Sequence, residues 1–243
     1  MGKIFDMDSP VMRFLSRMAD LMILNVVMTV CCLPIITIGA SVTAMHYVML
    51  KLVRKEEGYI VKDFFKSFKQ NFKQATIIWL IMLVFIFVFV GDYLIINYSG
   101  IEFPQNMAYV LTGVAMLLFV VSTYIFPVLS HFDNTIKNTI KNGCIMSIMA
   151  APKALLMALF TVAPVLLIFV VPALLPLVLL FGISFPAYLS AMLYSGTFRK
   201  FEPEVEPPAP EEEFHVRFDD EDEVPVLEEN EEKREETVVS DEL

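Results

Sequence analysis

Charged residues are nearly absent from four long stretches of this 243-residue sequence. These stretches hold one acidic residue, Asp92, one histidine, His46, and no lysine or arginine; they are residues 21–47, 75–96, 107–130 and 155–194. A helix needs about 20 apolar residues to cross a hydrocarbon core about 30 Å thick. Each stretch is therefore long enough to span a membrane, which excludes an ordinary soluble domain.

Cysteine and histidine are also scarce, with three of each. Three cysteines give no disulfide framework, and the adjacent Cys31 and Cys32 lie in an apolar run, where small thiols pack between helices. Three histidines supply no converging ligand set for a metal ion. No Gly-rich phosphate loop, Gly-x-Ser-x-Gly or His-Glu-x-x-His motif occurs. We therefore expect no enzyme activity, no catalytic or cofactor-binding residue and no metal site.

Charge is divided unevenly between the two ends of the chain. Residues 1–200 hold 15 Lys and Arg against 9 Asp and Glu, whereas residues 201–243 hold 3 against 19. A segment so acidic and so poor in apolar residues cannot bury enough surface to offset its ordering entropy. We predict an all-α, polytopic transmembrane helical bundle over residues 1–200 and a disordered acidic tail over residues 201–243.

Lysine and arginine predict the orientation, because they favour the cytoplasmic side of a membrane. Seven lie in residues 51–73 and three in residues 131–154, but none lies in residues 97–106. We expect the two basic segments inside and residues 97–106 outside. Arg199 and Lys200 then place the C-terminal tail in the cytoplasm.

The number of crossings depends on two predicted breaks. The last stretch has 40 residues and would be about 60 Å long as one helix, so its prolines predict two crossings around a turn at residues 171–176. In the first stretch, Pro34 and the small residues after it predict a helical hairpin with the N-terminus inside, which gives six segments. A single kinked span with the N-terminus outside gives five, and the sequence leaves this alternative open.

Polar side chains gather around the break in the first stretch. Such groups cost free energy inside a membrane unless they are paired or face water, and a broken helix exposes backbone groups that need surrounding protein or a water-filled cavity. The candidate polar site at this broken helix consists of Asn25, Pro34, Thr37, Gly39 and Ser41. It has two interpretations: a cavity for a polar substrate, or hydrogen bonding and small-residue packing between helices.

A second candidate surface lies on the predicted cytoplasmic side. Apolar residues recur every three to four positions from Val61 to Phe72, beside a row of lysines with the same spacing. This pattern is typical of a helix in the membrane interface, although the aromatic row can equally pack against neighbouring spans. A nucleic-acid partner is not expected, because the helix leads directly into an apolar stretch. The expected contacts with anionic lipid or a protein partner are Lys62, Phe65, Lys66, Phe68, Lys69, Phe72, Lys73, Lys137 and Lys141.

Two segments 68 positions apart resemble each other. Residues 68–75 (FKQNFKQA) and 136–143 (IKNTIKNG) both follow the pattern apolar, Lys, amide, any, apolar, Lys, amide, small. The pattern predicts a duplicated helix–elbow–helix unit, as internal repeats do in transporters. A chance similarity over eight residues is the alternative.

Several motifs together resemble the YesL-like family of bacterial membrane proteins, over roughly residues 1–200. They are residues 9–14, the break LPIITIGAS at 33–41, and the two cytoplasmic elbows at 62–79 and 127–152, in that order. The family has no established biochemical activity, so no catalytic residue carries over. Its members are typically encoded near genes for carbohydrate uptake and polysaccharide degradation in Gram-positive bacteria.

The resemblance implies a multi-pass protein of the bacterial plasma membrane. It further implies a non-enzymatic accessory or permease-like component of carbohydrate uptake, with a carbohydrate ABC transporter or another membrane complex as partner. Two alternatives stay open: a stand-alone small-molecule transporter that uses the broken helix, and a membrane scaffold or regulator that recruits a partner through its acidic tail.

Overall fold

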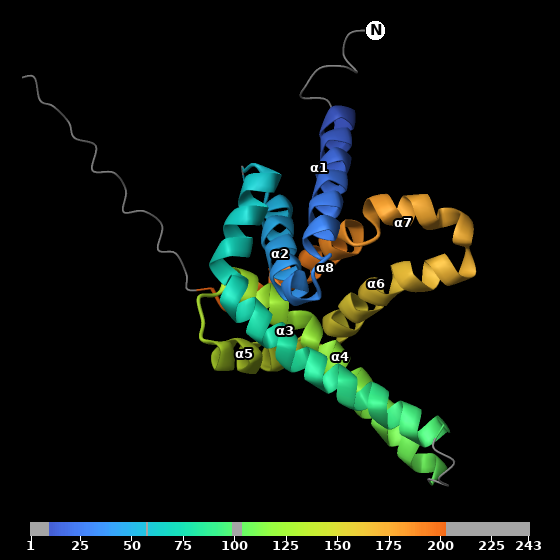
Figure 1. The fold of residues 1–243 in the computed structure, drawn as a ribbon. Coiled ribbons are helices and arrows are strands. Elements are labelled where there is room, and N and C mark those ends of the chain that lie inside the picture. The colour runs from blue at the N-terminus through green and yellow to red at the C-terminus, as the bar shows by residue number, and fades with distance from the viewer. Residues whose placement is uncertain (1–9, 57, 99–103, 203–243) are drawn as a thin grey trace, which may run out of the picture. The chain divides into compact units, whose positions relative to one another are not determined.

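The computed structural model describes residues 10–56, 58–98 and 104–202, which belong to one compact unit. Every regular element in these residues is a helix (Figure 1), so the predicted all-α fold is confirmed. The α-helices are α1 (Pro10–Cys31), α2 (Ile38–Arg54), α3 (Ile60–Tyr98), α4 (Gln105–His131), α5 (Ile136–Met149), α6 (Ala151–Val170), α7 (Leu175–Phe181) and α8 (Ser184–Phe198). Short 3-10 helices, η1 (Ile35–Thr37) and η2 (Pro172–Leu174), precede α2 and α7. The predicted disordered tail lies outside the described residues from position 203 onward.

The described residues contain five helical segments that are long and apolar enough to cross a membrane. A sixth can come from α7 and α8, which are bent by 58° at a short break. The first stretch is broken as predicted: α1 ends at Cys31, and α2 runs back beside α1 after η1 (Figure 1). Pro34 accounts for the break, because it disfavours helical geometry in the preceding residue and lacks a backbone N–H.

The last apolar stretch turns at the predicted position. It also has a second break, which the sequence analysis did not predict. The predicted turn at residues 171–176 contains η2 and the start of α7, whereas Pro164 lies inside α6 without ending it. Membrane helices tolerate such a proline when neighbouring groups satisfy the freed backbone. A further break separates α7 from α8 at Gly182 and Ile183; Pro186 in the first turn of α8 accounts for it, because its ring clashes with the carbonyl of residue 182 and it lacks a backbone N–H.

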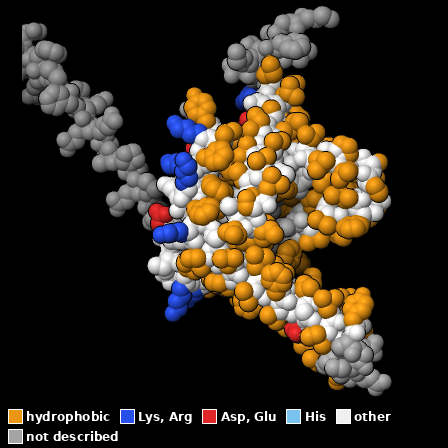
Figure 2. Space-filling view, viewed as in Figure 1, with side chains coloured by type: hydrophobic (Ala, Val, Ile, Leu, Met, Phe, Trp, Pro, Cys, Tyr) orange, Lys and Arg blue, Asp and Glu red, His pale blue; other side chains and the backbone are white. Residues whose placement is uncertain are grey.

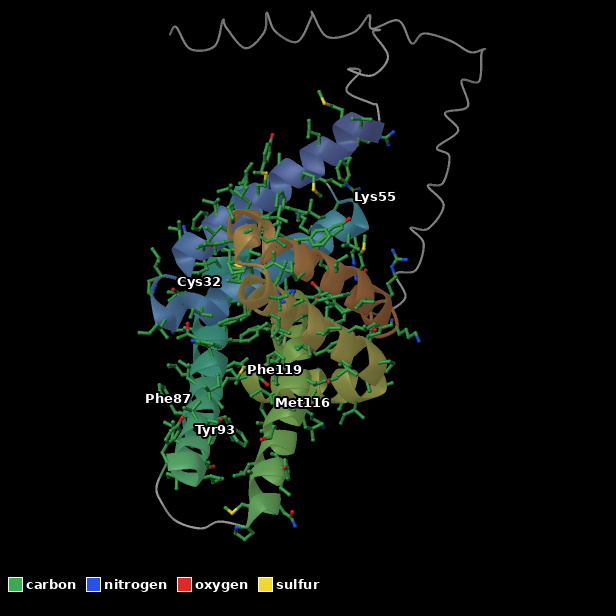
Figure 3. The ribbon with its side chains drawn as sticks, turned by 90° about the vertical axis from the view of Figure 1, so that its right-hand side faces the viewer. Cys32, Lys55, Phe87, Tyr93, Met116 and Phe119 are labelled. Carbon is green, nitrogen blue, oxygen red and sulfur yellow. The ribbon has the colours of Figure 1, made fainter. Side chains whose placement is uncertain are left out.

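Helix α3 joins the lysine-bearing segment and the second apolar stretch, which are therefore not separate elements. No proline or glycine occurs between residues 60 and 90, so no residue interrupts the helix. Its 39 residues correspond to about 58 Å, about twice the thickness of a hydrocarbon core. The outer parts of α3 and α4 leave large apolar side chains such as Phe87 and Met116 exposed (Figure 3), as lipid-facing surfaces do.

Helix α2 lies at the centre of the unit and packs against α3, α4 and α8. Near its start, α2 approaches α3 so closely that a Cβ on Gly39 would lie 2.6 Å from both the carbonyl oxygen of Ala75 and the Cβ of Trp79. The Trp79 indole N–H also donates a hydrogen bond of 2.8 Å to the carbonyl of Ile35 in η1. The α2–α3 contact therefore requires glycine at position 39.

We expect Gly39→Ala to lower the free energy of unfolding by about 1–3 kcal/mol, because the added methyl must push two helix backbones apart. Thermal unfolding in detergent measures this effect. Gly113→Ala is the matched control, since Gly113 is exposed on α4 and its added Cβ would have no atom within 4 Å apart from its chain neighbours and the local backbone of its own helix. The control should be neutral or stabilising by up to about 1 kcal/mol. Equal Tm values for the two variants would contradict the close contact.

Candidate functional site

The polar groups at the α1–α2 turn bond to one another. The Thr37 hydroxyl oxygen lies 2.6 Å from the carbonyl oxygen of Cys31 and 2.8 Å from that of Pro34, so the hydroxyl can donate to either. The buried Ser41 hydroxyl donates to the carbonyl of Thr37 at 3.0 Å. These bonds satisfy backbone carbonyls that the break exposes, which agrees with a structural turn between helices. Pro34, Thr37, Gly39 and Ser41 therefore lie together at this turn, and the polar site itself stays a prediction.

Asn25, the fifth residue of the predicted site, lies at a different break. Its buried side chain donates from Nδ2 to the carbonyl of Leu179 at 2.7 Å. Its Oδ1 accepts hydrogen bonds from the backbone N–H groups of Ile183 and Ser184, both at 3.1 Å. Assigning Asn25 to the turn at Pro34 is thus wrong. A side-chain amide can both donate and accept, so Asn25 bridges the end of α7 and the start of α8, where backbone groups lack helical partners.

We expect Asn25→Leu to lower the free energy of unfolding by about 1–3 kcal/mol, because it leaves three backbone groups at the α7–α8 break unpaired. Thermal unfolding in detergent tests this. Thr29→Val is the control, since the Thr29 hydroxyl bonds only within α1, to the carbonyl of Asn25. The control should cost less than about 1 kcal/mol. A smaller loss for Asn25→Leu than for the control would refute the bridging role.

The lysines of the predicted surface are exposed, but only some of its phenylalanines are. No ion pair between described residues involves the six lysines of this surface, and all six are exposed; they are Lys62, Lys66, Lys69, Lys73, Lys137 and Lys141. Figure 2 shows Lys and Arg side chains gathered along one edge of the unit, over the start of α3 and over α5, whereas hydrophobic side chains cover much of the rest of this face. Phe65 and Phe72 remain exposed, at 40% and 37%.

Phe68, by contrast, does not fit the role of a surface contact. It is half-buried against the core, and it stacks on the fully buried Phe64 with ring centroids 6.0 Å apart. The prediction for Phe68 is therefore corrected: the helix turns this side chain toward α2 and the core, as the alternative interpretation of the aromatic row expects. Only the flanking Phe65 and Phe72 are open to lipid or a partner.

A cluster that the sequence analysis missed joins three helix ends. Glu202, which follows α8, accepts a hydrogen bond from Arg54 at the end of α2 and lies 2.6 Å from His131 Nε2 at the end of α4. The His131 ring stacks on Phe198 of α8 with centroids 5.5 Å apart. The carboxylate therefore holds the C-terminal ends of α2, α4 and α8 on one side of the unit. These residues are far apart in the chain, so no local spacing signals the cluster.

The ionisation of Glu202 follows from these partners. Partial burial raises the pKa of Glu202, but the hydrogen bonds and charges of Arg54 and His131 outweigh burial, so its pKa lies below the ordinary value. A carboxylate with a lowered pKa in the folded state stabilises the fold above its unfolded pKa of about 4.3. That stabilisation is lost as the pH falls through the folded-state pKa.

We expect Glu202→Gln to lower the Tm at pH 7, because it removes the charge that holds Arg54 and His131 together. The difference from the unaltered protein should begin to shrink as the pH falls below the unfolded pKa of about 4.3, and it should disappear as the pH falls through the lowered folded-state pKa of Glu202. Tm measured in detergent across this pH range tests both statements. Asp133→Asn serves as the control, since Asp133 is exposed and forms no ion pair with a described residue. A difference that does not depend on pH would rule out the charge-based explanation.

An apolar groove lies between α6 and the α7–α8 segment. Its volume is about 260 Å³, and its lining includes Phe160, Leu167, Phe181 and Phe185. All residues that line it are apolar or glycine, so it offers no hydrogen-bonding side chain to a sugar. Among the described residues, no group of three His, Cys, Asp or Glu side chains is placed to hold a metal ion.

The comparisons with known proteins find a match to the model of a protein family. Residues 18–93 match the model of a family described as a protein of unknown function, DUF624. No curated protein and no solved structure matches the chain. The matched region runs from Met18 of α1 to Tyr93 of α3 and includes the hairpin, the Gly39 contact and the lysines of α3. Over this region the chain is similar to DUF624 proteins, an uncharacterised family that corresponds to the YesL-like family.

Proposed function

We propose that this protein is a non-enzymatic component of the bacterial plasma membrane, and that it serves carbohydrate uptake as an accessory or permease-like subunit. The start of α3 and the C-terminus face the cytoplasm in this proposal, in keeping with the loop charges. The link to carbohydrate rests on the resemblance to the YesL-like family alone, since the DUF624 family that matches residues 18–93 is described as being of unknown function. The partner is a carbohydrate ABC transporter or a similar membrane complex.

The observation that carries the proposal is the exposed, uncompensated start of α3. Lys62 and Lys66 form no ion pair with a described residue, and Phe65 between them is 40% exposed. Lys62 precedes the exposed Ile77 of α3 by 15 residues, or about 22 Å along the helix. In this proposal the start of α3 therefore lies on the cytoplasmic side of the level of Ile77, within reach of a partner. Lysines steer an acidic partner surface, and an exposed aromatic ring supplies a buried contact.

The two alternatives have less support. A stand-alone transporter needs a polar cavity. The polar groups of the α1–α2 turn bond to one another, however, and the groove between α6 and the α7–α8 segment is apolar. A regulator acting through the acidic tail would use residues 203–243, which lie outside the described residues. That alternative stays a prediction.

We expect the tagged full-length protein, solubilised from its native membrane in mild detergent, to retain subunits of a carbohydrate transporter. The double variant Lys62→Glu with Lys66→Glu should lower their recovery by about tenfold, since charge reversal makes the contact repulsive. Quantitative mass spectrometry and sugar uptake by the cells measure the effect.

The double variant Arg199→Glu with Lys200→Glu makes the same charge change at exposed positions after α8 and should retain the partner. If no transporter subunit is recovered with the unaltered protein, the proposed partner is wrong. If both double variants lose it equally, the start of α3 is not the contact.

A further inference from the structure

The two lysine-bearing segments are alike in their packing as well as in sequence. Residues 73–81 of α3 and 141–149 of α5 have the same degree of burial at eight of nine equivalent positions. The small residue of each is buried against the preceding helix: Ala75 lies under Gly39 of α2, and Gly143 lies where a Cβ would be 3.0 Å from Ile125 of α4. The pairs α2–α3 and α4–α5 therefore present equivalent faces outward.

Along the outward face of each segment, the exposed side chains change from lysine to isoleucine within one helical turn. Each face holds two exposed lysines and then an exposed isoleucine, spaced by four residues: Lys69, Lys73 and Ile77 on α3, and Lys137, Lys141 and Ile145 on α5. Ile77 is 44% and Ile145 is 41% exposed. Residues four apart lie on one face of a helix, about 6 Å apart along its axis. A change within one turn, in both segments, marks the level at which lipid headgroups meet the hydrocarbon.

The amide side chains that follow these lysines in the sequence can contribute to binding a phosphate group. Each of the four lysines is followed by a glutamine or asparagine, and Gln70 and Asn138 are exposed. A lysine ammonium binds phosphate as a point charge, and a side-chain amide can donate a further hydrogen bond to its oxygens. No carboxylate of a described residue pairs with these lysines.

We propose that Lys69 with Lys73, and Lys137 with Lys141, form two equivalent sites for the phosphate of anionic phospholipid headgroups. The lysines are one turn from side chains at hydrocarbon depth, so the phosphates of the surrounding leaflet lie at their level, whereas a soluble partner would have to enter the headgroup layer. Basic residues next to a membrane attract anionic lipid in this way. The sites are separate from Lys62 and Lys66, so this inference does not depend on the proposed function.

The test uses the full-length protein in nanodiscs made from equimolar phosphatidylglycerol and phosphatidylcholine, followed by mild detergent extraction and quantification of the retained lipids. Phosphatidylglycerol should be enriched by about fivefold for each lysine of a site. Replacing all four lysines with glutamine should abolish the enrichment, and replacing either pair should leave half of the retained phosphatidylglycerol. The fourfold control Lys62→Gln, Lys66→Gln, Arg199→Gln and Lys200→Gln removes the same charge and should keep the enrichment.

Several outcomes would overturn the proposal. Equal losses in the fourfold variant and its control would mean general charge attraction, and a loss confined to one pair would mean that the sites are not equivalent. Displacement of the lipid by inorganic phosphate alone would mean a site for free phosphate. The single-pair variants keep the test decisive if the fourfold variant does not fold.

Discussion

The close approach of α2 to α3 at Gly39 is the contact on which the rest of the unit depends. Lipid tails are as apolar as leucine, so helices in a membrane associate through close packing and hydrogen bonds. A missing side chain at Gly39 lets α2 touch the backbone of α3 at Ala75. The other faces of α2 pack against α4 and α8, so the position of α2 sets the positions of these helices as well.

Hydrogen bonds between distant segments of the chain connect further helix ends within the unit. Asn25 connects α1 to the α7–α8 break, and Glu202 connects the ends of α2 and α4 to the residues after α8. In both cases a polar group that would raise the free energy of the fold without a partner is paired, either with backbone groups or with basic side chains. These polar residues thus have structural partners, whereas the exposed lysines of α3 and α5 named above form no ion pair with a described residue and are open to other molecules.

The eight-residue repeat in the sequence corresponds to a similarity in packing between α3 and α5. Burial of Ala75 and Gly143 against the preceding helices orients both segments in the same way. The lysines then necessarily point outward, because positions two residues apart lie on different faces of a helix. The equivalence ends after residue 149, where α5 stops and α6 begins, whereas α3 continues to Tyr98.

The sequence by itself determined the all-α membrane class, the break at Pro34, the turn near residue 171 and the exposed lysines, but not whether the break makes a hairpin or a kinked span. These features depend on local chemistry: uncharged length, the geometry of proline and the spacing of residues along one helix. The tertiary structure alone decided that Phe68 packs inward, that Asn25 bonds to the α7–α8 break and that Glu202 joins the ends of α2, α4 and α8. Each of these depends on which helix lies beside which, and the partners of Asn25 and Glu202 lie 71 to 159 positions away in the chain. Local spacing carries no information about contacts at such separations.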